Sequence, residues 1–399
     1  MASTPLTETT RTVAASNLPR TGEKRFYHPE LDVLRLFAFL LVFSAHSSHP
    51  AESLLQRGWP PILVQVAEAF SSVGGFGVDV FFVLSAYLIT ELLLREKARF
   101  GHLDVRSFYV RRILRIWPLY FAFLFAAAAA SKWLTGSQDS WHVVLAFSLL
   151  GGNWWVIFHD WPSLAICPLW SVSVEEQFYL LWPPLVRRWT RRQLLLGCGG
   201  MIATAIATQL YLVAHGAEVE HIWCNSLARL DAIAGGILAA VLLSGRAPRL
   251  AGWLRVLLFG GGFAALLFSA GYLHTMEDPA RVTSIVMGYA IVALGSVSML
   301  ISILSESRPW FALAPLVYLG RISYGLYVFH YLALILTDKL LKRFPNGHAI
   351  RGGLPLALLL TVIFAALSYR YFETRFLRIK ERFAKVPSRP VGQNGLDLV

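Results

Sequence analysis

Apolar segments of membrane-spanning length recur along almost the whole of this 399-residue chain. An α-helix needs about 20 apolar residues to cross the hydrocarbon core of a bilayer, and only helices and closed barrels satisfy their backbone there. The eleven candidate segments are 32–50, 74–94, 113–131, 141–157, 169–186, 193–214, 226–244, 254–273, 282–304, 313–337 and 353–372. Since 56% of the residues are hydrophobic and only 15% are charged, the chain is predicted to be an all-α, polytopic membrane protein.

One of these segments differs from the others. The run 141–157 is interrupted by Gly151, Gly152 and Asn153, which weaken a membrane-spanning helix in its interior. We therefore predict that this segment is re-entrant or interfacial, and that about ten helices cross the bilayer.

The positions of the basic residues predict the orientation of these helices. Ten crossings place both termini on one side of the membrane, and 28 of the 36 Lys and Arg residues then lie on that side. Positive charge is retained on the cytoplasmic side, so we predict cytoplasmic termini and cytoplasmic clusters at 187–192 and 370–385. Residues 132–168 are expected outside. The net charge is +12, and the basic residues that produce it lie in short clusters between the apolar runs. This distribution favours a role in membrane orientation over nucleic-acid binding.

The predicted domain organisation follows from where the apolar segments begin and end. Residues 1–28 are polar and lack the apolar core of a secretory signal peptide, so we expect a flexible cytoplasmic tail. Residues 29–375 form the membrane domain, and residues 376–399 a short basic cytoplasmic tail. The expected location is the bacterial inner membrane.

The first apolar run carries ionisable side chains in an ordered stripe. Arg35 and His46 are eleven residues apart, which places them on one helix face and about 16 Å apart along the axis. Asp32 lies one turn before Arg35, and His49 lies one turn after His46. Ionisable groups inside a membrane helix face a partner or a cavity. The stripe is compatible with a packed Asp–Arg pair and a core histidine, or with a catalytic site.

Further charged residues occur at the predicted membrane depth or near helix ends. Asp79 follows a Gly-rich entry to the second helix, and Glu175 shares a helix face with Ser171. Arg112 and Arg115 are expected one turn apart at the start of the third helix. Paired arginines at a positive helix end can bind phosphates, although topology anchoring is the favoured explanation for any single arginine here.

Two of the three cysteines could form a disulfide bond. Cys167 and Cys224 are both expected near the outer ends of helices, where an oxidising compartment would permit a disulfide. Such a bond would tie the 132–168 region to the 215–225 loop. Sequence gives no distance between them, so separate thiols are the competing expectation.

Six sequence blocks, in this order, resemble acyltransferase family 3, the integral-membrane enzymes that O-acylate bacterial surface carbohydrates, Nod factors and some macrolides. They are LDVLRLFAFLLVFSAH, GVDVFFVLSAYLI, RRILRIWPLY, PLWSVSVEEQFYLLWP, RLDAIAGGILAA and RISYGLYVFH. The resemblance extends from residue 30 to about residue 375. It implies acyl transfer from a thioester such as acetyl-CoA, with no permanently bound cofactor and no metal ion.

The resemblance also implies roles for individual residues. Arg35 and His46 match the essential pair of the family, and Glu175 matches its acidic position. Arg112 and Arg115 match the donor-binding pair, and Arg35 is expected to assist them in binding acyl-CoA.

The residues themselves suggest a mechanism on that basis. A partly buried imidazole can be neutral at physiological pH, so His46 is the candidate general base on an acceptor hydroxyl. Asp79 or Glu175 is expected to fix its tautomer. Trp170, Tyr324 and His330 are the candidate substrate-binding residues.

Several points stay open from the sequence. The acceptor is expected to be a carbohydrate, a glycolipid or a secondary metabolite. A transporter or flippase of a lipid-linked sugar or small molecule is the alternative function, because intramembrane charges and re-entrant segments suit it as well.

Overall fold

Every regular element in the computed structural model is helical within the part of the chain that it describes. The described residues are 27–47, 55, 58–136, 140–162, 165–277, 281–304, 313–343 and 353–386. Most of the expected N-terminal tail, the end of the expected C-terminal tail and His49 lie outside these ranges. The all-α fold class predicted from the sequence is confirmed.

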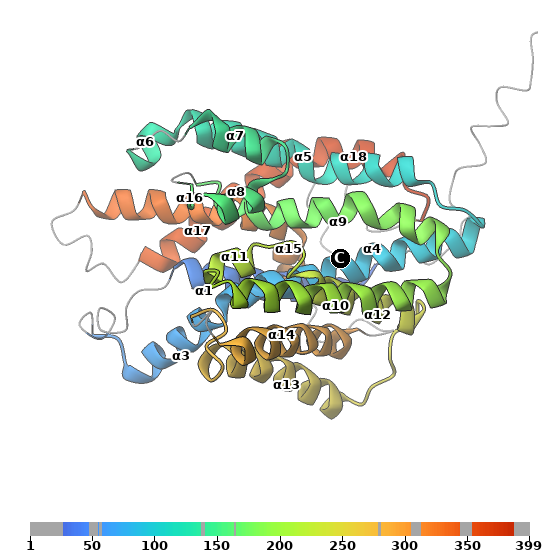
Figure 1. The fold of residues 1–399 in the computed structure, drawn as a ribbon. Helices are drawn as coiled ribbons and strands as arrows, with labels where there is room; N and C mark the ends of the chain where they lie inside the picture. Colours follow the sequence, from blue (N-terminus) through green and yellow to red (C-terminus); the bar gives the residue numbers. More distant parts are fainter. Residues whose placement is uncertain are drawn as a thin grey trace, which may run out of the picture.

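Long helices form the body of the molecule, and they run side by side along one common direction (Figure 1). They are α1 (Pro29–His46), α4 (Gly77–Phe100), α5 (Val105–Ala129), α9 (Leu169–Arg188), α10 (Arg191–Ala214), α12 (Leu230–Leu243), α13 (Gly252–Gly271), α14 (Val282–Ile303), α16 (Ser323–Leu341) and α17 (Gly353–Ser368). The shorter elements are α3 (Pro61–Ser72), η3 (Gly74–Phe76), α6 (Ser131–Thr135), α7 (Trp141–Ser148), α8 (Gly152–Phe158), α11 (Val219–Trp223), α15 (Ala314–Arg321), the π-helix η5 (Tyr369–Glu373) and α18 (Thr374–Glu381).

Six of the described helices are long and apolar enough to cross a membrane. They are Gly74–Phe100, Val105–Ala129, Arg191–Ala214, Gly252–Gly271, Val282–Ile303 and Gly353–Glu381. Helices α15 and α16 meet at a bend of 72° and would make a seventh span together. Charged residues set α1 and α9 apart from these spans, and α12 has only 14 residues. The membrane-protein class is confirmed, and the count of ten spans stays a prediction.

The interrupted segment forms two short helices, α7 and α8, instead of one long helix. They have 8 and 7 residues, so each is about 10–12 Å long, less than half of a hydrocarbon core. A buried polar network holds the second one: Asn153 Nδ2 donates to the Cys224 carbonyl and to Ser226 Oγ, while Gln177 Nε2 donates to Asn153 Oδ1. Because these hydrogen bonds satisfy the polar side chain of Asn153, the interruption between α7 and α8 is tolerated inside the protein.

Glycines allow the central helices to approach each other closely. A Cβ atom on Gly77 would lie 2.6 Å from the carbonyl oxygen of Ala38 in α1, and one on Gly236 would lie 2.2 Å from that of Val83 in α4. The backbones of α1, α4 and α12 therefore pack at distances that no larger residue permits. Helix α1 also contacts α14, α15 and α16, and Asp32, at the start of its polar stripe, is buried inside the bundle.

Helix α5 begins earlier than the apolar pattern indicated, and this changes the setting of the two arginines. The helix starts at Val105, so Arg112 and Arg115 lie in its third turn and beyond, not at its positive end. Asp104 caps that end by accepting hydrogen bonds from the backbone N–H and the hydroxyl of Ser107. These bonds lower the pKa of the Asp104 carboxyl, which therefore stays ionised at the helix terminus.

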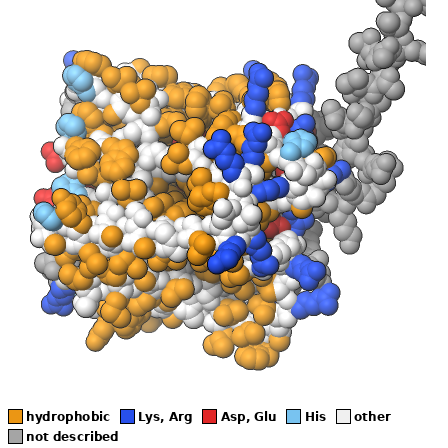
Figure 2. Space-filling model, turned by 45° about the vertical axis from the view of Figure 1, so that its right-hand side comes forward, with side chains coloured by type: hydrophobic (Ala, Val, Ile, Leu, Met, Phe, Trp, Pro, Cys, Tyr) orange, Lys and Arg blue, Asp and Glu red, His pale blue; other side chains and the backbone are white. Residues whose placement is uncertain are grey.

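The two ends of the bundle differ in charge. The α4–α5 turn, the α9–α10 turn and α18 lie at one end of the bundle, on the right in Figure 1, and α6, α7 and α8 lie toward the other end. Most of the Lys and Arg side chains visible in Figure 2 gather at the first end, and hydrophobic side chains cover the middle. Residues 376–381, expected as part of the tail, are helical and belong to α18, which packs against α5.

The disulfide alternative is not realised. Cys167 and Cys224 are not joined, and Cys224 is buried. The thiol of Cys167 instead contacts the carbonyl of Pro162 at 2.9 Å. The polar network around Asn153, not a covalent bond, links the short helices to the segment near Cys224.

Candidate active site

A cavity of about 220 Å³ lies among α1, α4, α5, α9, α16 and α18. It is lined by five of the residues that the sequence singled out, which are Arg35, Arg112, Arg115, Glu175 and Tyr324. These residues come from four helices that are far apart along the chain. The helical bundle therefore assembles most of the predicted donor site in one place.

Positive charge dominates the described residues that line this cavity. The cations are Arg35, Arg112, Arg115 and Lys380, and the carboxylate is Glu175. Arg35 forms the expected ion pair with Asp32, at 2.5 Å. Among the lining residues the cations outnumber the carboxylates, and this positive balance favours an anionic ligand.

Arg112 has the setting of a residue that awaits a ligand. Its guanidinium lies 5.5 Å from the ring centroid of Phe108 and 5.7 Å from that of Tyr179, and both rings orient it. Its buried Nε has no hydrogen-bond partner among the described residues. An orphaned buried donor is costly, and a phosphate oxygen would satisfy it.

Glu175 belongs to a chain of hydroxyl groups in the middle of the cavity. The Tyr179 hydroxyl donates to Glu175 Oε2 at 2.8 Å, and the Ser85 hydroxyl makes a short contact with the same tyrosine. Ser85 and Tyr179 also line the cavity. The carboxylate is thus held by a hydrogen bond from Tyr179 on its own helix, and it lines the cavity where a ligand would lie.

Another pair of hydroxyl groups lies where α9 and α16 meet. Ser171 Oγ and the Tyr327 hydroxyl are 2.6 Å apart, and Tyr327 also donates to the carbonyl of Pro168 at 2.9 Å. Both side chains line the cavity. The hydroxyl of Tyr324 donates to the Ile116 carbonyl at 3.0 Å, which fixes its ring at the wall of the cavity.

His46 and His330 form a pair outside the cavity lining. Their ring centroids are 5.0 Å apart, and His330 Nε2 lies 3.4 Å from His46 Nδ1. Tyr327 joins them to the cavity, because its carbonyl accepts a hydrogen bond from His330 Nδ1 at 2.6 Å. His330 is fully buried, whereas His46 at the end of α1 is exposed. The pair therefore lies between the cavity and the surface.

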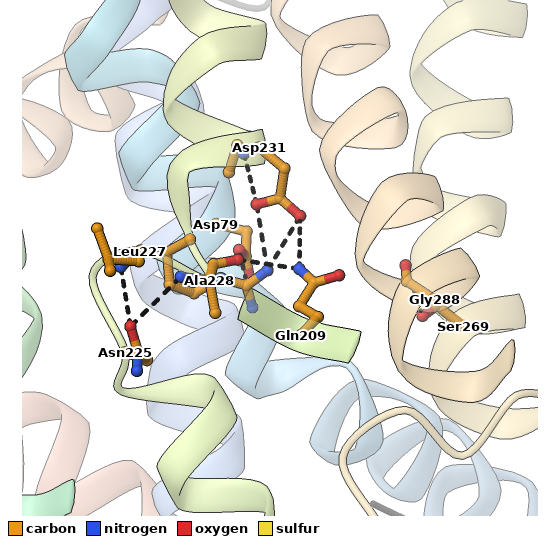
Figure 3. Close-up of polar contacts among 10 residues, drawn as sticks. Asp79, Gln209, Asn225, Leu227, Ala228, Asp231, Ser269 and Gly288 are labelled. Carbon is orange, nitrogen blue, oxygen red and sulfur yellow. Dashed lines mark hydrogen bonds and ion pairs between the residues drawn. The ribbon is translucent and has the colours of Figure 1, made fainter. Parts of the chain in front are cut away.

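Asp79 belongs to a different cluster, shown in Figure 3. Its carboxylate lies 3.7 Å from Nη1 of the fully buried Arg229, whose Nη2 is 3.3 Å from Asp231. Gln209 donates to Asp231 at 3.1 Å, and the ring of Tyr289 lies 3.6 Å from the guanidinium carbon. The cluster joins α4, α10, α12 and α14.

The expected partners of His46 are therefore not found at the imidazole. Asp79 pairs with Arg229, and Glu175 accepts from Tyr179. Among the described residues, the ring of His46 contacts Val42, His330 and Tyr331. Within the structure that is described, neither carboxylate fixes the tautomer of this histidine.

Trp170 also differs from expectation. Its side chain is 2% exposed, is not among the residues that line the cavity, and meets Trp223 at a centroid distance of 4.9 Å. Such packing is typical of a buried aromatic pair. The structure therefore does not bring Trp170 to the candidate substrate cavity.

Sequence reasoning missed several polar residues that line the cavity. Four of them are Ser85, Tyr179, Tyr327 and Lys380. A signal existed for two of them, because Tyr179 follows Glu175 by one helical turn and Tyr327 lies one turn before His330. Lys380 had no such signal, since it lies in the basic stretch expected to be a tail.

Comparison with known proteins adds independent information. Residues 28–370 match the sequence model of a family described as an acyltransferase domain. The peptidoglycan O-acetyltransferase OatA of Listeria monocytogenes is 28% identical over 388 residues, which cover 89% of this chain and 56% of that protein. The "Putative peptidoglycan O-acetyltransferase YrhL" of Bacillus subtilis is 28% identical over 374 residues, which cover 87% of this chain and 54% of that protein. The chain thus spans little more than half the length of these relatives. No solved structure matches.

Proposed function

The chain belongs to acyltransferase family 3, as the match over residues 28–370 shows, and on that premise we propose that it is an integral-membrane O-acyltransferase. It takes an acyl group, in the simplest case acetyl, from acyl-CoA and transfers it to a hydroxyl of a cell-envelope carbohydrate or glycolipid. The observation that carries the proposal is the cavity in which Arg35, Arg112 and Arg115 converge.

Acyl-CoA suits this cavity in charge. Its phosphates would meet Arg112 and Arg115, and the orphaned Nε of Arg112 is a donor for one of them. Arg35 and Lys380 supply further positive charge. The narrow, uncharged arm that carries the thioester would extend past Ser171 and Tyr327 toward the histidine pair.

His46 is proposed as the general base. The acceptor oxygen attacks the thioester carbon as Nε2 of His46 takes the hydroxyl proton, the carbon–sulfur bond breaks, and the CoA thiolate leaves. The exposed position of His46 lets an acceptor reach it without passing through the donor cavity. Glu175 and Tyr324 are proposed to position the donor within the cavity.

Two further observations support a proposal for the acceptor and for the orientation. Relatives named as peptidoglycan O-acetyltransferases favour a bacterial cell-wall carbohydrate as acceptor. The basic end of the bundle, which carries the α9–α10 turn and α18, is proposed to face the cytoplasm, where acyl-CoA is made (Figure 2). The protein would then lie in the bacterial inner membrane with both termini inside.

Turnover of acetyl-CoA by the purified protein in nanodiscs tests this function. With a soluble cell-wall glycan fragment present, the free CoA thiol should appear together with acetylated glycan. A carrier of lipid-linked sugars would leave the thioester intact. Binding of acetyl-CoA without consumption, while labelled lipid-linked sugar crosses sealed vesicles, would support the transporter and contradict the enzyme.

A further inference from the structure

The hydrogen bonds of His46 define which of its ring nitrogens carries the proton. Nδ1 lies 2.9 Å from the carbonyl oxygen of Val42. A carbonyl oxygen only accepts, so Nδ1 must be the donor. The neutral ring then carries its lone pair on Nε2, which is the nitrogen left to act as a base.

The same logic applies to His330. Its Nδ1 lies 2.6 Å from the carbonyl oxygen of Tyr327, so Nδ1 carries the proton and Nε2 carries the lone pair. This lone pair faces His46 Nδ1 at 3.4 Å, and the two ring planes meet at 66°. His46 Nδ1–H is thus shared between the Val42 carbonyl and His330 Nε2.

The contact with His330 distinguishes His46 from a matched histidine elsewhere in the chain. His215, at the end of α10, makes the same local bond from Nδ1 to the carbonyl four residues earlier, at 2.7 Å. It is exposed, and among the described residues its ring contacts that of Tyr211. The local bond alone is therefore a common feature of helix ends, and the second acceptor is what sets His46 apart.

His330 is held rigidly enough to direct its neighbour. It is fully buried, and its ring packs edge-on against Phe39 and close to Tyr327. No Asp or Glu is among the described residues that contact either imidazole. The buried neutral ring is therefore the group that occupies the position where the sequence analysis expected a carboxylate.

We propose that His330 is the positioning residue of the transfer reaction. As the second acceptor of Nδ1–H beside the Val42 carbonyl, it holds the His46 ring in the orientation and tautomer that present Nε2 as the base. When Nε2 takes the acceptor proton, positive charge develops on the His46 ring, and the bond from Nδ1–H to His330 becomes charge-assisted and stronger. This inference rests on the proposed function, and it assigns His330 a role apart from substrate binding.

Substitutions at His330 test the proposal in the full-length protein. His330→Leu removes the acceptor, His330→Gln offers an amide oxygen at similar reach, and His330→Asn offers one that is too short. We expect kcat to fall about 10–100-fold in the Leu and Asn variants, the range known for hydrogen-bond partners of metal-bound histidines. The KM for acetyl-CoA should stay within about twofold, and the Gln variant should recover much of the rate. His215→Gln should match the wild type.

The outcomes separate this inference from the function on which it rests. A wild-type kcat in His330→Leu, or equal losses in the Gln and Asn variants, would overturn the positioning role. A rise in KM with unchanged kcat would make His330 a substrate-binding residue instead. Should the Leu variant not fold, the Gln and Asn pair decides alone. If His46→Gln itself retains transfer, the proposed base fails, and the positioning role fails with it.

Discussion

At the scale of single residues, two arginines have different roles: Arg112 lines the cavity, and Arg229 lies in the buried cluster with Asp79 and Asp231. Arg112 carries a buried Nε with no hydrogen-bond partner among the described residues, which is the state of a donor that lacks its ligand. Arg229 is fully buried, whereas Arg112 is half-buried, and Nε and Nη1 of Arg229 also lack hydrogen-bond partners among the described residues. The charge of Arg229, however, is flanked by Asp79 and Asp231, and Tyr289 stacks on its guanidinium. The first arginine is suited to binding and the second to holding helices together.

The binding role predicts a loss of donor affinity. Arg112→Ala or Arg115→Ala should weaken acetyl-CoA binding by about 1.5–3 kcal/mol, the scale of a charge-assisted hydrogen bond. Arg112→Lys should rescue affinity only in part, since the lysine ammonium cannot donate the two parallel hydrogen bonds of a planar guanidinium. Isothermal titration of the protein in nanodiscs measures the affinity. Equal binding by the wild type and both Ala variants would reduce the arginines to topology anchors.

The structural role of Asp79 predicts a loss of stability. Asp79→Ala leaves Arg229 with one carboxylate partner and should lower the free energy of unfolding by about 1–3 kcal/mol. Asp338→Ala is the matched control, because its ion pair with Lys342 is more than half exposed and contributes about 0.5 kcal/mol or less. Thermal unfolding in detergent compares the two. A normally stable Asp79→Ala protein that binds donor but transfers nothing would return Asp79 to the reaction.

Contacts between residues that are close in sequence were predictable, whereas contacts between residues far apart in sequence were not. The pairing of Asp32 with Arg35 is correct because three residues on one helix fix their own geometry. The partner of Asp79 lies 150 residues further on, and helical periodicity defines a face but not the neighbour that it meets. The contact between His46 and His330 was missed for the same reason.

At the scale of helices, close approach packs α1 and α4 together, and both helices contribute residues to the wall of the cavity. Gly77 lets α4 lie against α1, and Gly236 lets α12 lie against α4. Most helix positions were predictable from apolar runs. Two features were not: the start of α5, and the bend of 72° that divides the run 313–337 into α15 and α16. The first turns of α5 contain polar residues and therefore lie outside the apolar run. The cap formed by Asp104 and Ser107 is the signal that locates the start of this helix.

This packing predicts that a single methyl group disturbs α1 and α4. Gly77→Ala would place its Cβ 2.6 Å from a backbone oxygen, so the helices must separate, at a cost of about 1–3 kcal/mol in stability. Gly199→Ala in α10 is the control, because nothing lies within 4 Å of the added Cβ. Its effect should be neutral or slightly stabilising. Similar unfolding midpoints for both variants would contradict the close approach.

At the scale of the whole molecule, charge is separated between the two ends of the bundle. The basic α9–α10 turn and α18 share one end, and α6 to α8 lie toward the other (Figure 1). The sequence predicted this grouping through its charge distribution, because orientation in a membrane follows Lys and Arg. The number of spans did not follow in the same way, since charges in α1 and α9 serve the bundle interior.

The orientation predicts which positions an impermeant thiol reagent reaches from outside. In a chain whose three cysteines are replaced by alanine, Ser140→Cys should react in intact cells. Thr190→Cys should react only after the membrane is permeabilised, because it lies between the basic pairs of the α9–α10 turn. Labelling of Thr190→Cys in intact cells would invert the proposed topology.

The most direct test of the whole account is acyl transfer by His46→Gln. Gln keeps a polar side chain of similar size but cannot take the proton, which is worth roughly 10²–10⁴ in rate. The variant should insert, unfold at the wild-type temperature, bind acetyl-CoA normally and transfer at about 1% of the wild-type rate or less. His215→Gln should keep full activity. A His46→Gln protein that keeps most of its rate while His330→Gln loses it would place the base on α16 and contradict the account.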